Sequence, residues 1–388
     1  MRDALESFAR IAVESGRLGR SRLLTRDSSL PATLDAIEGD WLANALSSFL
    51  PRARLSGVEV LDETSGTTAR RRLRLRYADD AKADGAPKSV FVKIQPPGFT
   101  ERLFGNLFRL GATEVGFYRD VRPSLPVQAP TCFAARDGRG GDFALVLEDL
   151  SASDAEFSTI ETPISVAKAT AVVRLLAKLH AHYWGSEIAE QHRWLRTPER
   201  MRNEAIERYV CVRAHRPTIE RFEELLPPSV RSGAAGIHRR RRALERFWAD
   251  GPRTLIHGDP HAGNLYFQRG VPGLFDWQVA QHHQGIRDVA YFLVLSLDTD
   301  LRRAHERGLF EAYVDALHEG SVPSADLDPN RLWTLYRSFS LYAYLGASVT
   351  ATMSDLQPKP IARLGLRRAA AAVDDLDALP LLAQIAAG

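Results

Sequence analysis

Residues 257–264 read His-Gly-Asp-Pro-His-Ala-Gly-Asn, and residues 274–277 read Leu-Phe-Asp-Trp. Both stretches belong to a short segment, 254–276, in which apolar pairs and triplets alternate with Gly, Asp, Asn and Pro. This alternation is typical of short strands joined by tight turns. Functional groups often lie on loops that a rigid scaffold holds in place, so we expect a functional site in this segment.

The spacing of three polar residues in this segment suits phosphoryl transfer. That chemistry needs a carboxylate that accepts the proton of the attacking hydroxyl, an Asn five residues later on Mg²⁺, and a second carboxylate on Mg²⁺ from the next hairpin. Asp259, Asn264 and Asp276 occur in that order. We predict Asp259 as catalytic base and Asn264 and Asp276 as metal ligands, although either Asp259 or Asn264 alone is equally typical of a turn.

The two histidines beside Asp259 leave a second interpretation open. His257, Asp259 and His261 stand at alternate positions and could form a zinc cluster, as in a metal-dependent hydrolase. This interpretation leaves Asn264 and Asp276 unexplained, and the intervening proline disfavours a regular strand through the three side chains. We therefore predict that His257 supports catalysis by orienting the loop through hydrogen bonds.

Three further side chains near these groups are candidates for contact with the acceptor molecule. They are His261, Trp277 and His282. His282 and its neighbour His283 lack a suitably spaced third ligand, so they do not indicate a metal site.

The periodicity of apolar residues predicts an α+β protein with two lobes. Short Val-, Leu- and Phe-rich segments indicate five strands, with one helix over 113–121 between the third and the fourth. These strands are predicted at 57–61, 71–77, 89–94, 130–135 and 143–147. From residue 164 onward apolar residues recur at helical spacing. We predict a helical extension over 1–50, a β-rich nucleotide-binding lobe over 51–148, and a mainly helical catalytic and acceptor-binding lobe over 149–388.

A lysine inside the third predicted strand is the candidate for contact with the nucleotide phosphates. Lys93 is the one charged residue of the apolar stretch 89–94, and a buried lysine needs a partner. Glu114, in the predicted helix, can form an ion pair that aims the ammonium at the phosphates. The alternatives are a lysine that reaches solvent from an edge strand and a solvated acid in the first turn of a helix.

Two other segments can contribute to nucleotide binding. Gly66 lies in a polar turn between the first two predicted strands, where backbone amides could close over the phosphates, although an ordinary hairpin turn explains it nearly as well. Glu148, Asp149 and Leu150 follow the fifth strand. They could offer backbone groups to an adenine edge, or they could simply link the lobes.

The amino-acid composition limits the possible classes of protein and partner only broadly. The chain has 388 residues, of which 45% are hydrophobic and 26% charged, and a net charge of +3, which does not by itself indicate a nucleic-acid partner. Its two cysteines stand in no metal-ligand spacing, and its longest apolar run is about half the length that a membrane span needs. We expect a cytoplasmic protein with no membrane span and no nucleic-acid partner. The oligomeric state is left open.

Taken together, these motifs resemble the aminoglycoside phosphotransferase and choline kinase superfamily, and within it the ecdysteroid kinase-like branch. The resemblance covers roughly residues 55–350 and is carried by four segments: 145–150, 255–265, 275–278 and 288–293. It implies a protein-kinase-like fold with two lobes, ATP or GTP with Mg²⁺, and a hydroxylated acceptor bound by the helical lobe. It also implies that Asp288 braces the catalytic loop. The loop around Gly66 is poorer in glycine than the family pattern.

The predicted function is therefore transfer of a phosphoryl group from ATP or GTP to a hydroxyl of a small molecule. The acceptor can be aminoglycoside-like, steroid-like, choline-like or a hydroxyacyl compound. Two alternatives are an inactive nucleotide-binding module of the same fold and a metal-dependent hydrolase.

Overall fold

The computed structural model describes residues 2–23, 29–51, 54–78, 85–200, 204–353 and 357–387. Residues 24–28 of the predicted helical extension lie outside the described residues. The chain forms two compact units. One contains residues 7–155 and 275–279, which we call the sheet unit; the other contains residues 1–6, 156–274 and 280–388, which we call the helical unit.

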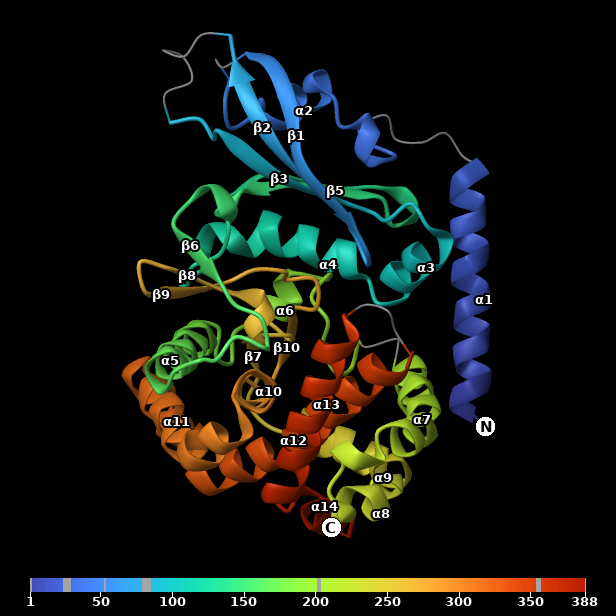
Figure 1. The fold of residues 1–388 in the computed structure, drawn as a ribbon, viewed down its shortest axis with the longest axis vertical. Helices are drawn as coiled ribbons and strands as arrows, with labels where there is room; N and C mark the ends of the chain where they lie inside the picture. The colour runs from blue at the N-terminus through green and yellow to red at the C-terminus, as the bar shows by residue number, and fades with distance from the viewer. Residues whose placement is uncertain are drawn as a thin grey trace. The chain divides into compact units, whose positions relative to one another are not determined.

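The sheet unit contains a five-stranded antiparallel sheet in the order β1-β2-β3-β5-β4 (Figure 1). All five strands were predicted, and β3 has the predicted bounds. The long strand β1 extends beyond its prediction because its outer residues are polar and exposed, and so carry no apolar signal. The strands are β1 (Leu55–Ser65), β2 (Ala69–Tyr77), β3 (Ser89–Ile94), β4 (Cys132–Asp137) and β5 (Phe143–Glu148).

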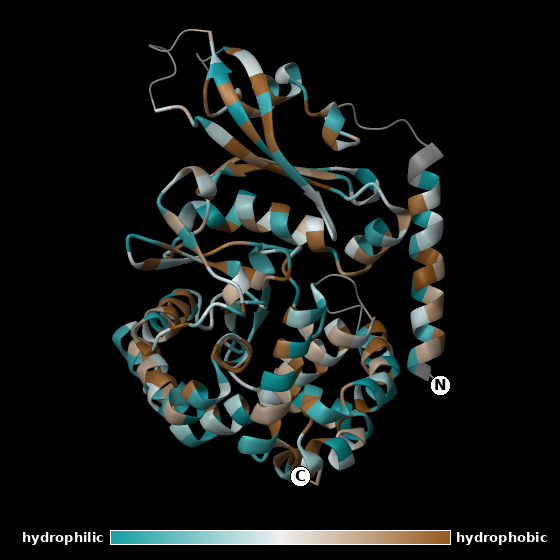
Figure 2. Ribbon diagram, in the orientation of Figure 1, coloured by the Kyte–Doolittle hydropathy of each residue, from teal (hydrophilic) through white to brown (hydrophobic). Residues whose placement is uncertain are grey.

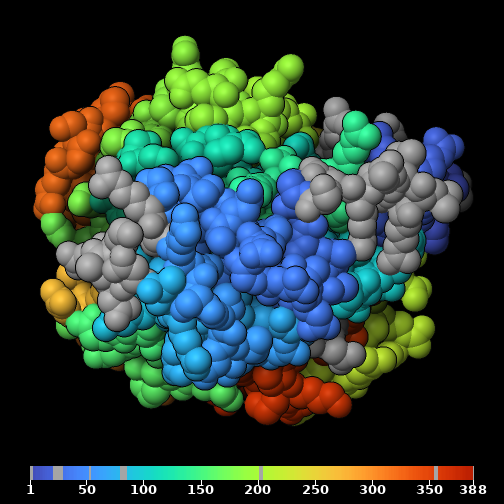
Figure 3. Space-filling view, turned by 90° about the horizontal axis from the view of Figure 1, so that it is seen from above, coloured from blue at the N-terminus to red at the C-terminus, as the bar shows by residue number. Residues whose placement is uncertain are grey.

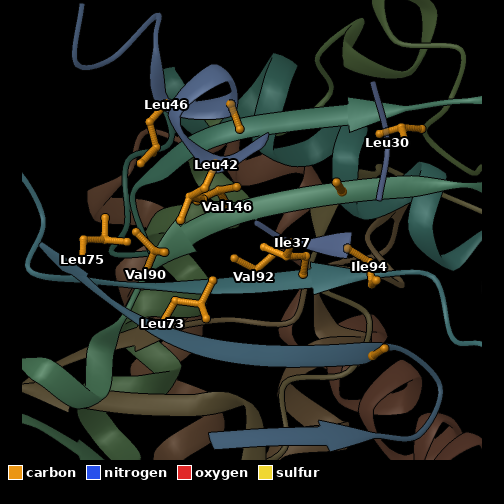
Figure 4. Packing of buried hydrophobic residues seen from close by; sticks show 13 residues of the cluster. Leu30, Ile37, Leu42, Leu46, Leu73, Leu75, Val90, Val92, Ile94 and Val146 are labelled. Carbon is orange, nitrogen blue, oxygen red and sulfur yellow. The ribbon is translucent and has the colours of Figure 1, made fainter. Parts of the chain in front are cut away.

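One face of this sheet carries an apolar core that includes helix α2 (Gly39–Leu46). Side chains alternate between the faces of a strand, so Val90, Val92 and Ile94 of β3 point to this core together (Figure 4). Leu42 of α2 packs among them and is fully buried. The alternation leaves Lys93 on the opposite face of β3. Seen from above, α2, β1 and β2 lie side by side at the surface (Figure 3).

The opposite face of the sheet is covered by helix α4 (Leu110–Gly116), which contacts β4 and β5 (Figure 1). A side chain at Gly111 would come within 2.4 Å of the ring of Phe143, so glycine allows the close approach of α4 to β5. The helix predicted over 113–121 begins three residues earlier, and it continues from Phe117 to Val121 as a wider π-helical turn. Helix α3 (Phe99–Leu107) was not predicted, and the chain begins with helix α1 (Arg2–Leu23).

The helical unit is built around helix α10 (Ile286–Ser296), which packs against α5, α11, α12 and α13. Nearly all side chains of α10 are buried, and most of them are apolar (Figure 2). The other helices of this unit are α5 (Val166–His182), α6 (Ile188–Gln191), α7 (Glu204–Arg221), α8 (Pro228–Gly233), α9 (Ala235–Ala249), α11 (Thr299–Glu319), α12 (Pro329–Met353), α13 (Lys359–Asp375) and α14 (Ala378–Ile385).

Short strands interrupt these helices, and three of them lie within the segment 254–276 in which the sequence predicted short strands. Strand β7 (Thr254–Ile256) pairs antiparallel with β10 (Gln281–His283), and β8 (Leu265–Gln268) forms a hairpin with β9 (Val271–Leu274). A further short strand, β6 (Ala155–Phe157), lies where the chain leaves the sheet unit. The predicted α+β class, with a β-rich N-terminal part and a mainly helical C-terminal part, is confirmed. None of the described helices is long and apolar enough to cross a membrane.

Candidate active site

The loop between β7 and β8 carries the predicted catalytic residues. Gly258 has φ 89°, a left-handed conformation that favours glycine, and it turns the chain sharply before Asp259. The backbone N–H of His261 then donates to the carbonyl oxygen of Asp259 at 2.9 Å, and a 3₁₀ turn over Ala262–Asn264 leads into β8. The loop therefore has a defined conformation, with Asp259 at its bend.

Asp288, in the first turn of α10, holds the start of this loop. Its carboxylate accepts the backbone N–H of His257 at 2.7 Å and that of Gly258 at 3.0 Å. The carboxylate is fully buried, where bonds to a charged acceptor are strong. Nε2 of the buried His180 lies 3.5 Å from the same carboxylate, and Nδ1 of His180 is 2.9 Å from the hydroxyl of Tyr313. This geometry fits the bracing role that the family resemblance implied.

The two loop histidines use their Nδ1 atoms in backbone contacts. Nδ1 of the buried His257 accepts from the N–H of Asp259 at 3.3 Å, and Nδ1 of His261 accepts from the N–H of Gly263 at 3.0 Å. Nε2 of His261 lies 3.6 Å from Oδ2 of Asp259. Over the described ranges of the chain, no three His, Cys, Asp or Glu side chains form a group that could hold a metal ion.

Asn264 connects directly to the predicted base. Its side-chain nitrogen donates to the backbone oxygen of Asp259 at 2.9 Å and to Oδ2 of the same residue at 3.1 Å. Both bonds use the amide nitrogen, so the amide oxygen is the atom that Asn264 can offer to a cation. The residue can therefore orient Asp259 and still act as an oxygen ligand.

Tyr291 is a further partner of Asp259. It lies on α10, close enough to Asp259 for the negative charge of that carboxylate to act on its hydroxyl. Burial raises the pKa of Tyr291 well above its ordinary value, and the negative charge of Asp259 raises it further. A tyrosine in this state stays protonated. Sequence reasoning assigned it no role, because Tyr291 stands in an apolar stretch that reads as helix core.

In the sheet unit, Lys93 lies between two carboxylates. Its Nζ is 2.6 Å from Oε2 of Glu114 and 2.8 Å from Oδ1 of Asp276. The side chains of Lys93 and Glu114 are only 3% and 1% exposed, which excludes both a lysine that reaches solvent and a solvated helix acid. Burial raises the pKa of Glu114, while the charge of Lys93 acts in the opposite direction.

Asp276 has an unusual backbone conformation. Its φ is 65°, in the left-handed region that non-glycine residues seldom adopt. Its side chain remains 16% exposed while contacting Lys93, and Arg70 lies 3.9 Å from its other oxygen. Strained backbone of this kind concentrates at functional sites, so the strain accords with a functional role for Asp276.

Comparison with known proteins shows the family to which this chain belongs. The sequence pattern of the ecdysteroid kinase-like family matches residues 67–322, which is more than half of the chain. The chain belongs to the ecdysteroid kinase-like family. The predicted resemblance is thereby confirmed, and Lys93, Glu114, Asp259, Asn264 and Asp276 all lie within the matched range. A search of curated proteins finds no match.

Several solved structures are similar to this ecdysteroid kinase-like protein. Macrolide 2′-phosphotransferase from Brachybacterium faecium is 18% identical, with 86% of this chain and 98% of the other covered and a TM-score of 0.47. Choline kinase from Streptococcus pneumoniae is 15% identical, with 87% and 98% covered and a TM-score of 0.46. A choline/ethanolamine kinase family protein from Mesorhizobium loti is 15% identical, with 90% and 99% covered and a TM-score of 0.46.

The predicted phosphate loop is a turn in this ecdysteroid kinase-like structure, and its contact with phosphates stays a prediction. Gly66 lies in the turn between β1 and β2, and its N–H donates to the carbonyl oxygen of Thr68 at 3.0 Å. A Cβ at Gly66 would meet no atom within 4 Å, so no steric contact requires glycine here. Gly66 also lies just outside the range that matches the family. A hairpin turn accounts for what the structure shows.

The predicted linker residues have structural partners within the sheet unit. The Asp149 carboxylate accepts from Arg72 at 3.0 Å and from the hydroxyl of Ser89 at 2.7 Å. Glu148 ends β5 and accepts the N–H of Thr131 through its side chain at 2.9 Å, and Leu150 is buried. These side chains stabilise the end of the sheet. Contact with an adenine edge through their backbone groups stays a prediction.

Two acceptor-side candidates differ in their surroundings. Trp277 is fully buried, and its ring stacks on that of Phe117 with centroids 3.9 Å apart. This packing argues against a contact with an acceptor, and we do not propose one. His282 is half-buried on β10, and burial above all lowers its pKa, so its imidazole favours the neutral form.

Proposed function

We propose that this protein is a kinase that transfers the γ-phosphoryl group of ATP or GTP to a hydroxyl of a small molecule. One observation carries the proposal: Asp259 stands at the bend of a braced loop, and Asn264 donates to both its carboxylate and its backbone oxygen. A carboxylate that is 29% exposed and held in one orientation is suited to act as a catalytic base. Membership of the ecdysteroid kinase-like family supports a kinase activity in general.

In the proposed reaction Asp259 accepts the proton of the acceptor hydroxyl. The hydroxyl oxygen forms a bond to the γ-phosphorus while the bond from that phosphorus to the β,γ-bridging oxygen breaks. The nucleoside diphosphate leaves with the electrons of that bond. The protein takes little part in the covalent chemistry of this reaction. The main contribution of the helical unit is therefore that Asp259 orients the acceptor hydroxyl.

We propose that the sheet unit contributes a positive charge that binds the nucleotide phosphates. Lys93 binds phosphate oxygens of the nucleotide, and Glu114 positions the lysine through the buried ion pair. Bound Mg²⁺ would neutralise negative charge on the triphosphate. The amide oxygen of Asn264 and the carboxylate of Asp276 are the ligands that we propose for it. Both are oxygen donors, as Mg²⁺ prefers, and this donor set does not suit zinc.

His261 is the residue that we propose for contact with the acceptor. Its side chain is 19% exposed, and its Nε2 lies 3.6 Å from Oδ2 of Asp259. A group in this place can contact an acceptor whose hydroxyl reaches Asp259. Because Nδ1 accepts from the Gly263 N–H, Nε2 is the nitrogen that carries a proton in the neutral ring.

A nucleotide-consumption screen tests the proposal. The purified protein is incubated with Mg²⁺ and ATP or GTP against pools of hydroxylated metabolites, and diphosphate and phosphorylated acceptor are both measured. We expect equal amounts of the two products with at least one pool. Tight nucleotide binding with no turnover in any pool would favour an inactive nucleotide-binding module. Stoichiometric zinc in the purified protein would favour a hydrolase.

A further inference from the structure

Arg287 is a buried cation that lacks an anionic partner. It is the second residue of α10 and is only 5% exposed. Its guanidinium lies over the ring of Tyr342, with 4.0 Å between Cζ and the ring centroid, and Nη2 donates to the hydroxyl of Tyr342. Nε is buried without a hydrogen-bond partner. In the part of the chain that the structure describes, no carboxylate forms a salt bridge with Arg287.

Three other buried arginines of the helical unit have carboxylate partners. Arg302 pairs with Glu306 and Asp375, Arg241 pairs with Glu245, and Arg368 pairs with Asp298. Burial of a charge is costly unless the charge is paired and hydrogen-bonded. The stacking on Tyr342 offsets part of that cost, but a ring supplies no negative charge. Arg287 is therefore the exception among these residues, with donor capacity left over.

The position of Arg287 links it to the catalytic loop. Tyr291 lies four residues further along α10, so both side chains are on the same face of the helix. The ring of Tyr291 is 5.9 Å from that of Tyr342, and the negative charge of Asp259 acts on the Tyr291 hydroxyl. Asp259, Tyr291 and Tyr342 are all partly exposed. Two partly exposed tyrosines thus connect the surroundings of Asp259 with those of the buried guanidinium.

A second buried guanidinium acts on the same cluster. Burial above all raises the pKa of Tyr342. The positive charges of Arg287 and Arg196 lower this pKa, while the negative charges of Glu207 and Asp259 raise it further. Arg196 is 9% exposed, and its backbone oxygen accepts from the N–H of His282. The surroundings of Tyr342 therefore include two cations besides the catalytic carboxylate and Glu207.

We propose that Arg287 binds an oxyanion group, a carboxylate or a phosphate, of the acceptor whose hydroxyl reaches Asp259. This inference rests on the proposed function and narrows its acceptor to hydroxylated anions. A guanidinium suits both oxyanions because its N–H groups lie in one plane and match their oxygens. The rings of Tyr291 and Tyr342 provide an apolar surface for the carbon atoms between the hydroxyl and the anionic group.

Matched probes test the inference by binding, without nucleotide. The probes are 4-hydroxybutyrate with its neutral amide, and glycerol 3-phosphate with glycerol. We expect one or both anions to raise the melting temperature of the wild-type protein and the neutral partners to leave it unchanged. Stabilisation by only one anion identifies the oxyanion. Equal effects of an anion and its neutral partner, or no effect of either anion, would overturn the inference.

Variants give the inference a second test. Arg287→Gln keeps a hydrogen-bonding side chain without the charge, and we expect it to weaken anion binding about tenfold or more. Arg307→Gln is the matched control, because Arg307 also stacks on an aromatic ring, with 4.6 Å between its Cζ and the Trp333 ring centroid. The control should bind the anions like wild type. Unchanged anion affinity in Arg287→Gln would overturn the inference, and the wild-type comparison stands even if that variant does not fold.

Measurements of turnover distinguish a failure of this inference from a failure of the proposed function. If the enzyme consumes nucleotide with anionic acceptors, Arg287→Gln should raise KM for them about tenfold and change kcat little. Consumption that depends on Asp259 but is as fast with neutral acceptors would overturn the role of Arg287 and leave the kinase proposal intact. Anion binding that requires Arg287, without any phosphorylated product, would support the anion site and count against the kinase.

Discussion

The side-chain amide of Asn264 donates to both the backbone oxygen and the carboxylate of Asp259, at 2.9 and 3.1 Å. One residue is thereby bonded to the proposed base and still presents an oxygen that can bind Mg²⁺. In the proposed reaction, this side chain would couple the orientation of the acceptor hydroxyl to the placement of the nucleotide. This coupling explains why the five-residue spacing between the two positions matters chemically.

We predict that Asn264→Ala and Asp276→Ala each weaken the binding of Mg²⁺-ATP, because each removes an oxygen ligand of the metal. Isothermal titration calorimetry with Mg²⁺-ATP measures the change. His261→Ala is the control, since it should leave nucleotide affinity unchanged and alter KM for the acceptor. Wild-type affinity in both of the first two variants is incompatible with the proposed metal ligands.

We predict that Lys93→Ala and Glu114→Ala act on the same step. Removing the lysine removes charge at the phosphates, and removing Glu114 lets the lysine leave its position. Residues that work as a unit are non-additive, so the double variant should be little worse than Lys93→Ala alone. Steady-state kinetics of the three variants gives the comparison. Two penalties that multiply would mean that Glu114 does not act through Lys93.

We predict that Tyr291→Phe lowers kcat about tenfold and leaves the affinity for Mg²⁺-ATP unchanged. The change removes a polar hydroxyl from the surroundings of the Asp259 carboxylate and leaves the ring in place. Tyr344→Phe is a suitable control, because it also removes a buried hydroxyl from this unit. A kcat for Tyr291→Phe that equals that of the control would show that the Tyr291 hydroxyl does not assist Asp259.

Stability should fall as the pH decreases from about 6.5 to about 4, in part because of His238. Burial above all lowers the pKa of His238 to about 4 in the folded protein, while the unfolded chain has the ordinary value of 6.5. Between these values the unfolded state binds the extra proton, so acidification favours unfolding. The nearby His215 has a lowered pKa as well and acts in the same direction.

Urea denaturation at several pH values measures this effect. We expect the free energy of unfolding of His238→Gln to depend less steeply on pH in this window than that of the wild type. Identical pH dependence in the two proteins would mean that protonation of His238 is not linked to unfolding.

Sequence reasoning found the parts of the site that have a local signature. Lys93 interrupts an apolar strand whose alternation is visible, and the loop at 257–264 has diagnostic spacing. Side chains that act from a helix interior have no such signature. His180 and Tyr291 stand in apolar stripes that look like ordinary core, and a pattern of apolar residues does not show which polar member contacts a catalytic group.

The other differences between the predicted and the observed structure also arise from properties of the folded chain. An aromatic residue beside a catalytic motif can line a site or fill a core, and only the stacking of Trp277 on Phe117 separates the two. The sequence also did not show that Arg287 has no carboxylate partner among the described residues, because pairing is a property of the folded chain. The π-helical turn after α4 was not predicted either, because local helix propensity does not describe such turns.

The most direct test of the central claim is the turnover of Asp259→Asn, with its affinity for Mg²⁺-ATP measured on the same preparation. A positioned base typically contributes a factor of roughly 100 to 10,000. We predict that phosphorylation of a verified acceptor falls by about this factor while nucleotide affinity stays close to that of the wild type. Full turnover in a folded Asp259→Asn preparation would contradict the account, because the loop that carries Asp259 would then have no part in catalysis.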